Sequence, residues 1–129
     1  MILKSGMYND IKIDCEKDSR IDARIDFKTD IYYPIVNNKS VYKDYDISSP
    51  LLTAINISES GICFKSRIAI EKADFISFML KIDNYPSFWC LAEVKWVEER
   101  ENIYIVGCKF YLLKEEYLNV INNYVRSGV

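Results

Sequence analysis

Residues 88–110 read FWCLAEVKWVEERENIYIVGCKF, and this stretch decides the fold class. Apolar side chains recur at every second position in residues 88–98, and again in residues 103–110 after a polar break at residues 99–102. A period of two is typical of a strand that buries one face, so we predict a β-hairpin. The side chains expected on the buried face are Cys90, Ala92, Val94 and Trp96 in the first strand, and Tyr104, Val106, Cys108 and Phe110 in the second.

Shorter runs with β-type patterning precede the hairpin. They cover residues 25–33, 51–57, 62–66 and 75–82, the last with a register shift near Ser77, while residues 34–50 are expected to form an irregular excursion. Five or six short strands joined by turns favour an all-β, antiparallel sheet, and closure into a barrel would remove exposed edges. Residues 114–125 instead follow helical spacing and predict one terminal helix. Its apolar stripe comprises Tyr117, Leu118, Ile121, Tyr124 and Val125.

The overall composition excludes several classes of protein. The 129 residues fit one domain, and 50% of them are apolar, which is enough for one sizeable core. A net charge of −2 argues against a partner that is a nucleic acid polymer, because coating such a polymer requires a strongly basic surface. The chain contains neither a long apolar run nor the pattern of a secretory signal. We therefore expect a cytoplasmic protein without direct membrane insertion.

The residue types also argue against catalysis and metal binding. Histidine, the commonest general base and metal ligand, does not occur in the sequence. Cys15, Cys63, Cys90 and Cys108 form no C-x-x-C pair, so we interpret them as small buried residues, with a zinc site as the weaker alternative. The carboxylates are scattered among basic residues. We expect no enzyme activity, no catalytic residues, no metal and no resident cofactor.

Two short motifs contain residues suited to ligand binding. Arg20 and Arg24 form an R-x-x-x-R pattern, and an arginine side chain binds phosphate or guanine through its planar fork and stacks on aromatic rings. Asn56, Ser58 and Gly61 lie in the sequence NISESG, where glycine is expected to adopt φ > 0 and to let a ligand approach. Taken singly, the first motif also fits a solvated run of paired charges. The second also fits an ordinary hairpin turn.

Together, the order and spacing of the two motifs resemble the PilZ domain family, in which R-x-x-x-R precedes [D/N]-x-S-x-x-G by about 30 residues. Glu93–Trp96 (EVKW) and Val106–Phe110 (VGCKF) are similar to the family's last strands, where tryptophan precedes a G-x-x-F strand. The resemblance covers residues 18–125. It implies a six-stranded antiparallel split β-barrel of PilZ type with a C-terminal α-helix, formed by residues 20–129. Residues 1–19 would be a flexible N-terminal lead-in.

The resemblance also implies that the chain binds the bacterial second messenger cyclic di-GMP. Arg20 and Arg24 would wrap over the dinucleotide, Asn56 and Ser58 would meet a guanine edge, and Gly61 would hold the turn in shape. The ligand would order the N-terminal arginine segment and relay the signal to a downstream protein partner in motility, pilus or exopolysaccharide control.

Two departures from the family pattern bear on ligand binding. Ser19 stands where members often carry a basic residue, which leaves open one ligand or an intercalated pair, and a monomer or a ligand-sensitive dimer. Asn56 replaces the more usual aspartate. The alternative function is a degenerate PilZ barrel that acts as a nucleotide-independent scaffold, but the intact motif residues favour a receptor. Tyrosines within residues 32–45 are a further candidate partner surface.

Overall fold

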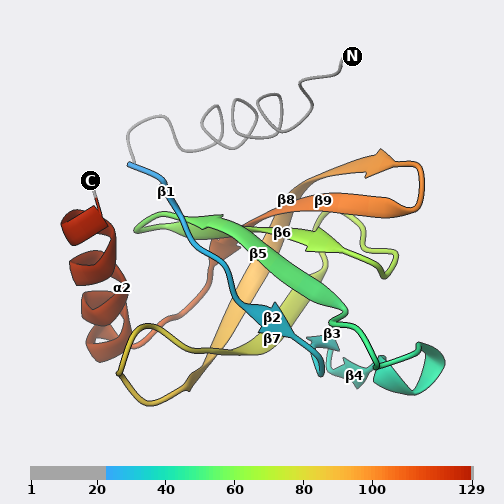
Figure 1. Ribbon diagram of the computed structural model, residues 1–129, viewed down its shortest axis with the longest axis horizontal. Helices are drawn as coiled ribbons and strands as arrows, with labels where there is room; N and C mark the ends of the chain where they lie inside the picture. The colour runs from blue at the N-terminus through green and yellow to red at the C-terminus, as the bar shows by residue number, and fades with distance from the viewer. Residues whose placement is uncertain (1–22, 129) are drawn as a thin grey trace.

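The computed structural model describes residues 23–128, which form one antiparallel sheet and a C-terminal helix (Figure 1). The strands are β1 (Ile25–Asp26), β2 (Asp30–Ile31), β3 (Ile35–Val36), β4 (Lys39–Ser40), β5 (Leu52–Ile57), β6 (Gly61–Ser66), β7 (Phe75–Leu80), β8 (Phe88–Arg100) and β9 (Ile103–Phe110). Their order in the sheet is β1-β5-β6-β9-β8-β7-β3-β4, and β2 also pairs with β5. The sheet is not closed, which is consistent with a split barrel. The all-β fold class with a terminal helix is therefore confirmed.

The strand predicted over residues 25–33 is present in two parts. Both β1 and β2 pair antiparallel with β5, and between them the side chain of Phe27 turns into the core. Thr29 still accepts a hydrogen bond from the backbone of Ala54, so the intervening residues stay attached to β5. Counted as one interrupted strand, β1 and β2 make the expected six together with β5, β6, β7, β8 and β9.

The remaining two strands correct the prediction of an irregular excursion over residues 34–50. β3 and β4 form a hairpin whose two turn residues, Asn37 and Asn38, have φ of 51° and 68°. Asparagine tolerates this left-handed region, and turns with two such residues suit the twist of paired strands. The Asn-Asn doublet was the available signal for this hairpin. The 3₁₀ helix η1 (Tyr42–Asp44) follows it.

The register of β7 also differs from the prediction. Its pairing with β8 runs without a break from Phe75 opposite Glu93 to Leu80 opposite Phe88, so there is no shift near Ser77. Strict alternation sends every second side chain of β7 into the core. The buried residues are Ile76, Phe78 and Leu80.

The register shift lies instead in β8, where Lys95 is an extra residue between Val94 and Trp96. Val94 is opposite Cys108 and faces the core, whereas Trp96 is opposite Gly107 and faces outward. The prediction that Trp96 shares the buried face of β8 was therefore wrong. A bulge of this kind exchanges the two faces for every residue beyond it.

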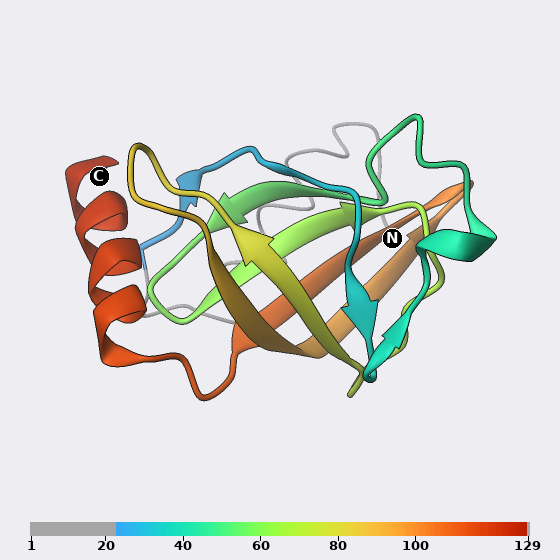
Figure 2. The same cartoon turned by 90° about the horizontal axis from the view of Figure 1, so that it is seen from below.

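The helix α2 (Glu115–Gly128) covers one end of the sheet (Figures 1 and 2). The ring of Tyr117 stacks on Phe88 with centroids 4.3 Å apart, and Tyr124 meets Phe27 edge-on at 5.5 Å. Of the predicted stripe, Tyr117, Ile121, Tyr124 and Val125 pack on the core, and Val120 rather than Leu118 completes it. Within residues 23–128, no helix combines the length and the hydropathy needed to cross a bilayer.

We expect the core to depend on the aromatic pair Phe64 and Phe78, which are fully buried with ring centroids 5.1 Å apart. Phe78→Leu should lower the free energy of unfolding by about 1–2 kcal/mol, because the edge-to-face contact is lost and a small cavity is left. Met79→Ala, one residue away on the outward face, should change it by less than about 0.5 kcal/mol. Urea denaturation measures both, and equal effects would contradict the assigned alternation of β7.

Candidate functional site

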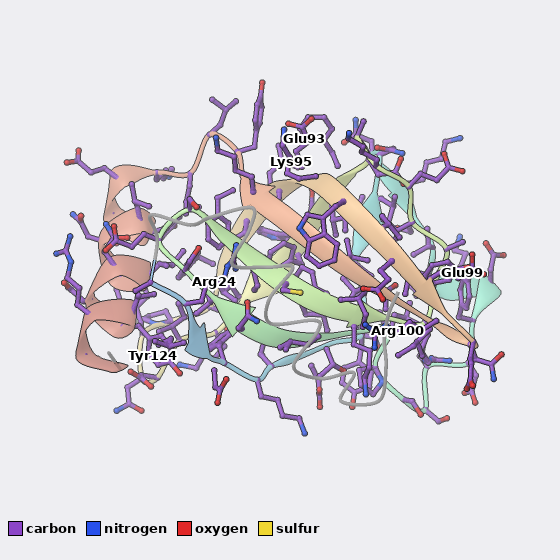
Figure 3. The ribbon with its side chains drawn as sticks, turned by 90° about the horizontal axis from the view of Figure 1, so that it is seen from above. Arg24, Glu93, Lys95, Glu99, Arg100 and Tyr124 are labelled. Carbon is purple, nitrogen blue, oxygen red and sulfur yellow. The ribbon has the colours of Figure 1, made fainter. Side chains whose placement is uncertain are left out.

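The two sequence motifs meet where β1 pairs with the end of β5. Asp26 lies opposite Asn56 in this pairing, and Arg24 immediately precedes β1. The guanidinium Nη1 of Arg24 donates a hydrogen bond to Oδ1 of Asn56 at 3.1 Å, across 32 residues of sequence. Figure 3 looks onto the outward face of the sheet, with Arg24 toward the α2 end and Arg100 toward the opposite end.

Asn56 faces outward because β5 carries one residue more than β6 at this point. Ala54 is opposite Phe64 in the core, but Asn56 is opposite Cys63, which belongs to a small separate cluster on the outward side. The extra residue is Ile55. Asn56 is nevertheless only 3% exposed and makes the hydrogen bond to Arg24. The amide of Asn56 therefore contacts the guanidinium of Arg24 rather than bulk water.

Ser58 forms the turn between β5 and β6. Its backbone N–H donates to the carbonyl of Gly61 at 2.9 Å, and its hydroxyl oxygen accepts hydrogen bonds from the N–H groups of Ser60 and Gly61 at 3.3 and 3.2 Å. The side chain is 0% exposed. In this structure the Ser58 hydroxyl therefore stabilises its own turn, as expected if the motif is an ordinary hairpin turn. Glu59, at the tip of the turn, pairs with Arg126 of α2 at 3.4 Å.

Gly61 is required for a different reason from the one that the sequence indicated. No glycine in the described residues has a positive φ, so the expectation of φ > 0 at Gly61 was wrong. A Cβ at this position would lie 2.2 Å from the carbonyl oxygen of Cys108 in β9. Since that oxygen belongs to the backbone of a paired strand, it cannot simply move aside. Gly61 thus allows β9, rather than a ligand, to approach closely.

A row of residues that lie opposite one another on neighbouring strands extends the site over the outward face of the sheet. Asn56 is opposite Cys63, Cys63 is opposite Gly107, and Gly107 is opposite Trp96. The indole of Trp96 lies across Gly107, where a Cβ would come within 2.2 Å of its Cε2 and Nε1 atoms. Trp96 was not predicted as part of this face. The available signal was an isolated glycine within a strand, which often marks a close approach.

Four of the five residues predicted for the site thus lie in one corner of the sheet, where β1, β5 and β6 meet. Arg24 and Asn56 are in contact, and Ser58 and Gly61 form the adjoining turn. Arg20, Cys15 and the predicted lead-in of residues 1–19 lie outside the described residues. The boundary predicted between the lead-in and the domain therefore stays a prediction.

This corner combines a guanidinium and an amide with a nearby aromatic surface, which are groups of the kind that bind and orient ligands in other proteins. Cys63, Cys90 and Cys108 are buried, and burial raises the pKa of Cys90 to about 12. That thiol is protonated at neutral pH, which is unsuited to a nucleophile. Within residues 23–128, no three histidine, cysteine or acidic side chains gather closely enough to hold a metal ion.

Comparison with known families adds independent evidence to this geometry. The family model described as "PilZ domain" matches residues 16–127, a range that includes both motifs, all the strands and most of α2. No curated protein matches the chain.

The close packing of β6 on β9 predicts the effect of a change at Gly61. Gly61→Ala should lower the free energy of unfolding by about 1–3 kcal/mol, because the added methyl group overlaps the Cys108 carbonyl. Glu59→Ala in the same turn removes only a surface ion pair and should cost about 0–1 kcal/mol. Chemical denaturation distinguishes the two. If both variants unfolded like the wild type, the steric role assigned to Gly61 would be refuted.

Proposed function

The chain belongs to the PilZ domain family, a family of cyclic di-GMP-binding domains, and from this premise we propose that it is a cyclic di-GMP receptor. The observation that carries the proposal is the hydrogen bond from Arg24 to Asn56. It joins the two motifs of the family on one outward face, although 32 residues separate them. PilZ domains bind rather than transform their ligand, which agrees with a site made of a guanidinium and an amide.

We assign the first contacts with the ligand to the arginines. The fork of a guanidinium matches the O6 and N7 acceptors of guanine, and one such bidentate contact contributes about 1–3 kcal/mol of discrimination. Arg24 would exchange its hydrogen bond with Asn56 for one with a guanine or a phosphate of cyclic di-GMP. Arg20, four residues earlier, would supply the second guanidinium. Asn56 would then offer its amide to the guanine edge.

The rest of the corner would shape and extend the binding surface. Ser58 and Gly61 fix the turn, which holds Asn56 at the end of β5. Trp96 lies three strands from Asn56, about 14 Å at the usual strand spacing, and gives an aromatic surface for a second base. Base stacking on an aromatic side chain contributes about 1–3 kcal/mol. We therefore expect micromolar affinity, about −8 kcal/mol, once ordering is deducted.

Ligand binding would change the surface that the receptor presents to other proteins. Binding would draw the arginine segment of residues 20–24 onto the sheet and present a new surface to a downstream protein partner. We place this receptor in the cytoplasm, where cyclic di-GMP acts, in control of motility, a pilus or an exopolysaccharide. Its state would be a monomer or a ligand-sensitive dimer.

One observation favours a second candidate function. Asn56 and Ser58 are both buried, and both already have hydrogen-bond partners within the chain. A degenerate PilZ barrel, used as a nucleotide-independent scaffold, would have the same arrangement. The two functions differ in whether cyclic di-GMP displaces Arg24 from Asn56.

Calorimetric titration with cyclic di-GMP tests whether the chain binds this ligand through its two arginines. The wild type should bind with a dissociation constant in the micromolar range, and Arg20→Ala/Arg24→Ala should weaken binding by about 100-fold or more, since two charged contacts are removed. Lys28→Ala, an exposed basic residue between β1 and β2, is the control for charge alone and should bind almost as the wild type does.

The same titration decides between the two functions. The stoichiometry distinguishes one ligand from an intercalated pair. Absence of heat at millimolar ligand, with no thermal stabilisation, would support the scaffold instead. An equal loss of affinity in Lys28→Ala and in the double variant would show that general charge, rather than the arginine pair, attracts the ligand.

Hydrogen exchange tests the ordering step. Saturating cyclic di-GMP should slow amide exchange in residues 20–24 by about tenfold or more, because ordering a segment closes its exchange-competent states. The strand β7, which pairs with β8 and β3 and not with β1 or β5, should change little and serves as the internal reference. Unchanged exchange in residues 20–24 at saturation would rule out a relay through this segment while leaving ligand binding intact.

A further inference from the structure

The outward face of the sheet holds an apolar cluster that is separate from the main core. Its central residues, Cys63 of β6 and Ile105 of β9, are 0% and 1% exposed, and three partly buried side chains pack against them: Ile55, Trp96 and Ile103. We name these five residues the outward cluster. Outward positions of an antiparallel sheet are usually polar when water covers them. Two apolar side chains that are almost completely buried there indicate that something lies over this face.

No element of the described chain lies over the outward cluster. The helix α2 lies at one end of the sheet, and Figure 3, which looks onto the outward face, has no described helix or strand in front of β6 and β9. The carboxylate of Glu98, opposite Ile105, supports the same conclusion. Its Oε1 atom is buried and has no hydrogen-bond partner within residues 23–128. The cover must therefore come from outside the described residues.

The N-terminal residues are attached beside this face. The described chain starts at Ala23, and Arg24 already lies on the outward side, in contact with Asn56. From β1 to Trp96 in β8 the sheet is four strand spacings wide, about 19 Å. The 22 residues before Ala23 would span about 33 Å even at the helical rise of about 1.5 Å per residue. They are therefore long enough to cross the whole outward cluster.

The N-terminal sequence contains the apolar side chains that such a cover needs. Ile2, Leu3, Met7, Ile11 and Ile13 are all apolar. Three of them, Leu3, Met7 and Ile11, recur at every fourth position, which is the spacing of side chains that share one side of a helix. The same segment can therefore present several apolar side chains to one surface.

The charges on both sides are compatible with this contact. The outward face around the cluster carries both signs: Arg24, Asp26, Lys65, Glu93, Lys95, Glu98, Arg100 and Lys109. Residues 1–22 are also mixed, with four basic and five acidic side chains. Charge alone therefore selects no occupant, and the assignment depends on the apolar surface and on the short connection.

We propose that residues 1–19 dock on the outward cluster, with apolar side chains such as Met7 and Ile11 over Cys63 and Ile105. A segment that is already attached to the sheet loses less freedom on docking than a separate molecule does, so a small apolar contact is sufficient. The docking would replace the flexible lead-in expected from the sequence. It lies wholly within the chain and does not rest on the proposed function.

The docking has a consequence that does rest on the proposed function. Residues 1–19 would lie over Trp96, the surface that we assign to a second base. The segment and cyclic di-GMP would then compete for one face, and the ligand-free chain would keep its receptor surface covered. The apparent affinity would be lowered by the fraction of chains whose face is uncovered.

Alkylation of Cys63 with iodoacetamide, located by peptide mass spectrometry, tests the docking in the full chain without ligand. In the wild type, Cys63 and the core residue Cys90 should both react at least about 100-fold more slowly than in the urea-unfolded chain. Met7→Asp/Ile11→Asp should speed the reaction of Cys63 by about tenfold or more, because carboxylates leave an apolar contact for water. The rate at Cys90 should not change.

The matched control is Ser5→Asp/Asn9→Asp, which adds the same two charges at the same spacing and should leave Cys63 protected. Rapid alkylation of Cys63 in the wild type, no acceleration in the first variant, or an equal acceleration in the control would each overturn the proposal. Equal acceleration at Cys90 would also overturn it, since the domain would then have unfolded. Protection of Cys63 that is lost on dilution would assign the cover to a second copy of the chain instead.

Titration of Met7→Asp/Ile11→Asp with cyclic di-GMP tests the competition separately. This variant should bind the nucleotide about threefold or more tightly than the wild type does, because no docked segment has to leave. Equal affinity of the two chains would refute the competition. If neither chain bound the nucleotide while the alkylation results held, the receptor would be rejected and the docking retained.

Discussion

Two register shifts determine which side chains this sheet presents outward. In β5 the extra residue lies between Ala54 and Asn56, and in β8 it lies between Val94 and Trp96. Because side chains alternate along a strand, each shift exchanges the two faces beyond it. Without the shift in β5, the amide of Asn56 would enter the core, where an unpartnered polar group costs about 1–3 kcal/mol by mutational measurement. The contact with Arg24 would then not form.

Much of the fold could be predicted because its signals are local. The alternation of residues 103–110 and the helical spacing before the C-terminus each depend on a few neighbouring residues, and both were confirmed. The predicted face of Trp96 and the predicted register shift near Ser77 were wrong, because a bulge depends on the pairing with the neighbouring strand and not on the alternation within one strand. The β3–β4 hairpin was missed although Asn37 and Asn38 marked it locally.

The sequence indicated which residues belong to the candidate site but not all of the contacts that these residues make. The motif spacing indicated that Arg24 and Asn56 belong together, and the structure places them in contact. The requirement for glycine at position 61 was also visible, but its cause was not. The carbonyl of Cys108 approaches only once β9 has paired with β6, and no pattern within the turn encodes that contact. The hydrogen bond that the Ser58 hydroxyl accepts within its own turn was likewise not predicted as its main role.

The position of α2 has a consequence for the order of events during synthesis. The helix follows every described strand in the sequence, yet Tyr117 covers Phe88 of β8 and Tyr124 covers Phe27 beside β1, two strands that are not neighbours in the sheet. A nascent chain can therefore pair its strands before it can cover these two rings. Until α2 emerges from the ribosome, this end of the sheet exposes apolar surface, and the domain is completed only after the helix has been synthesised.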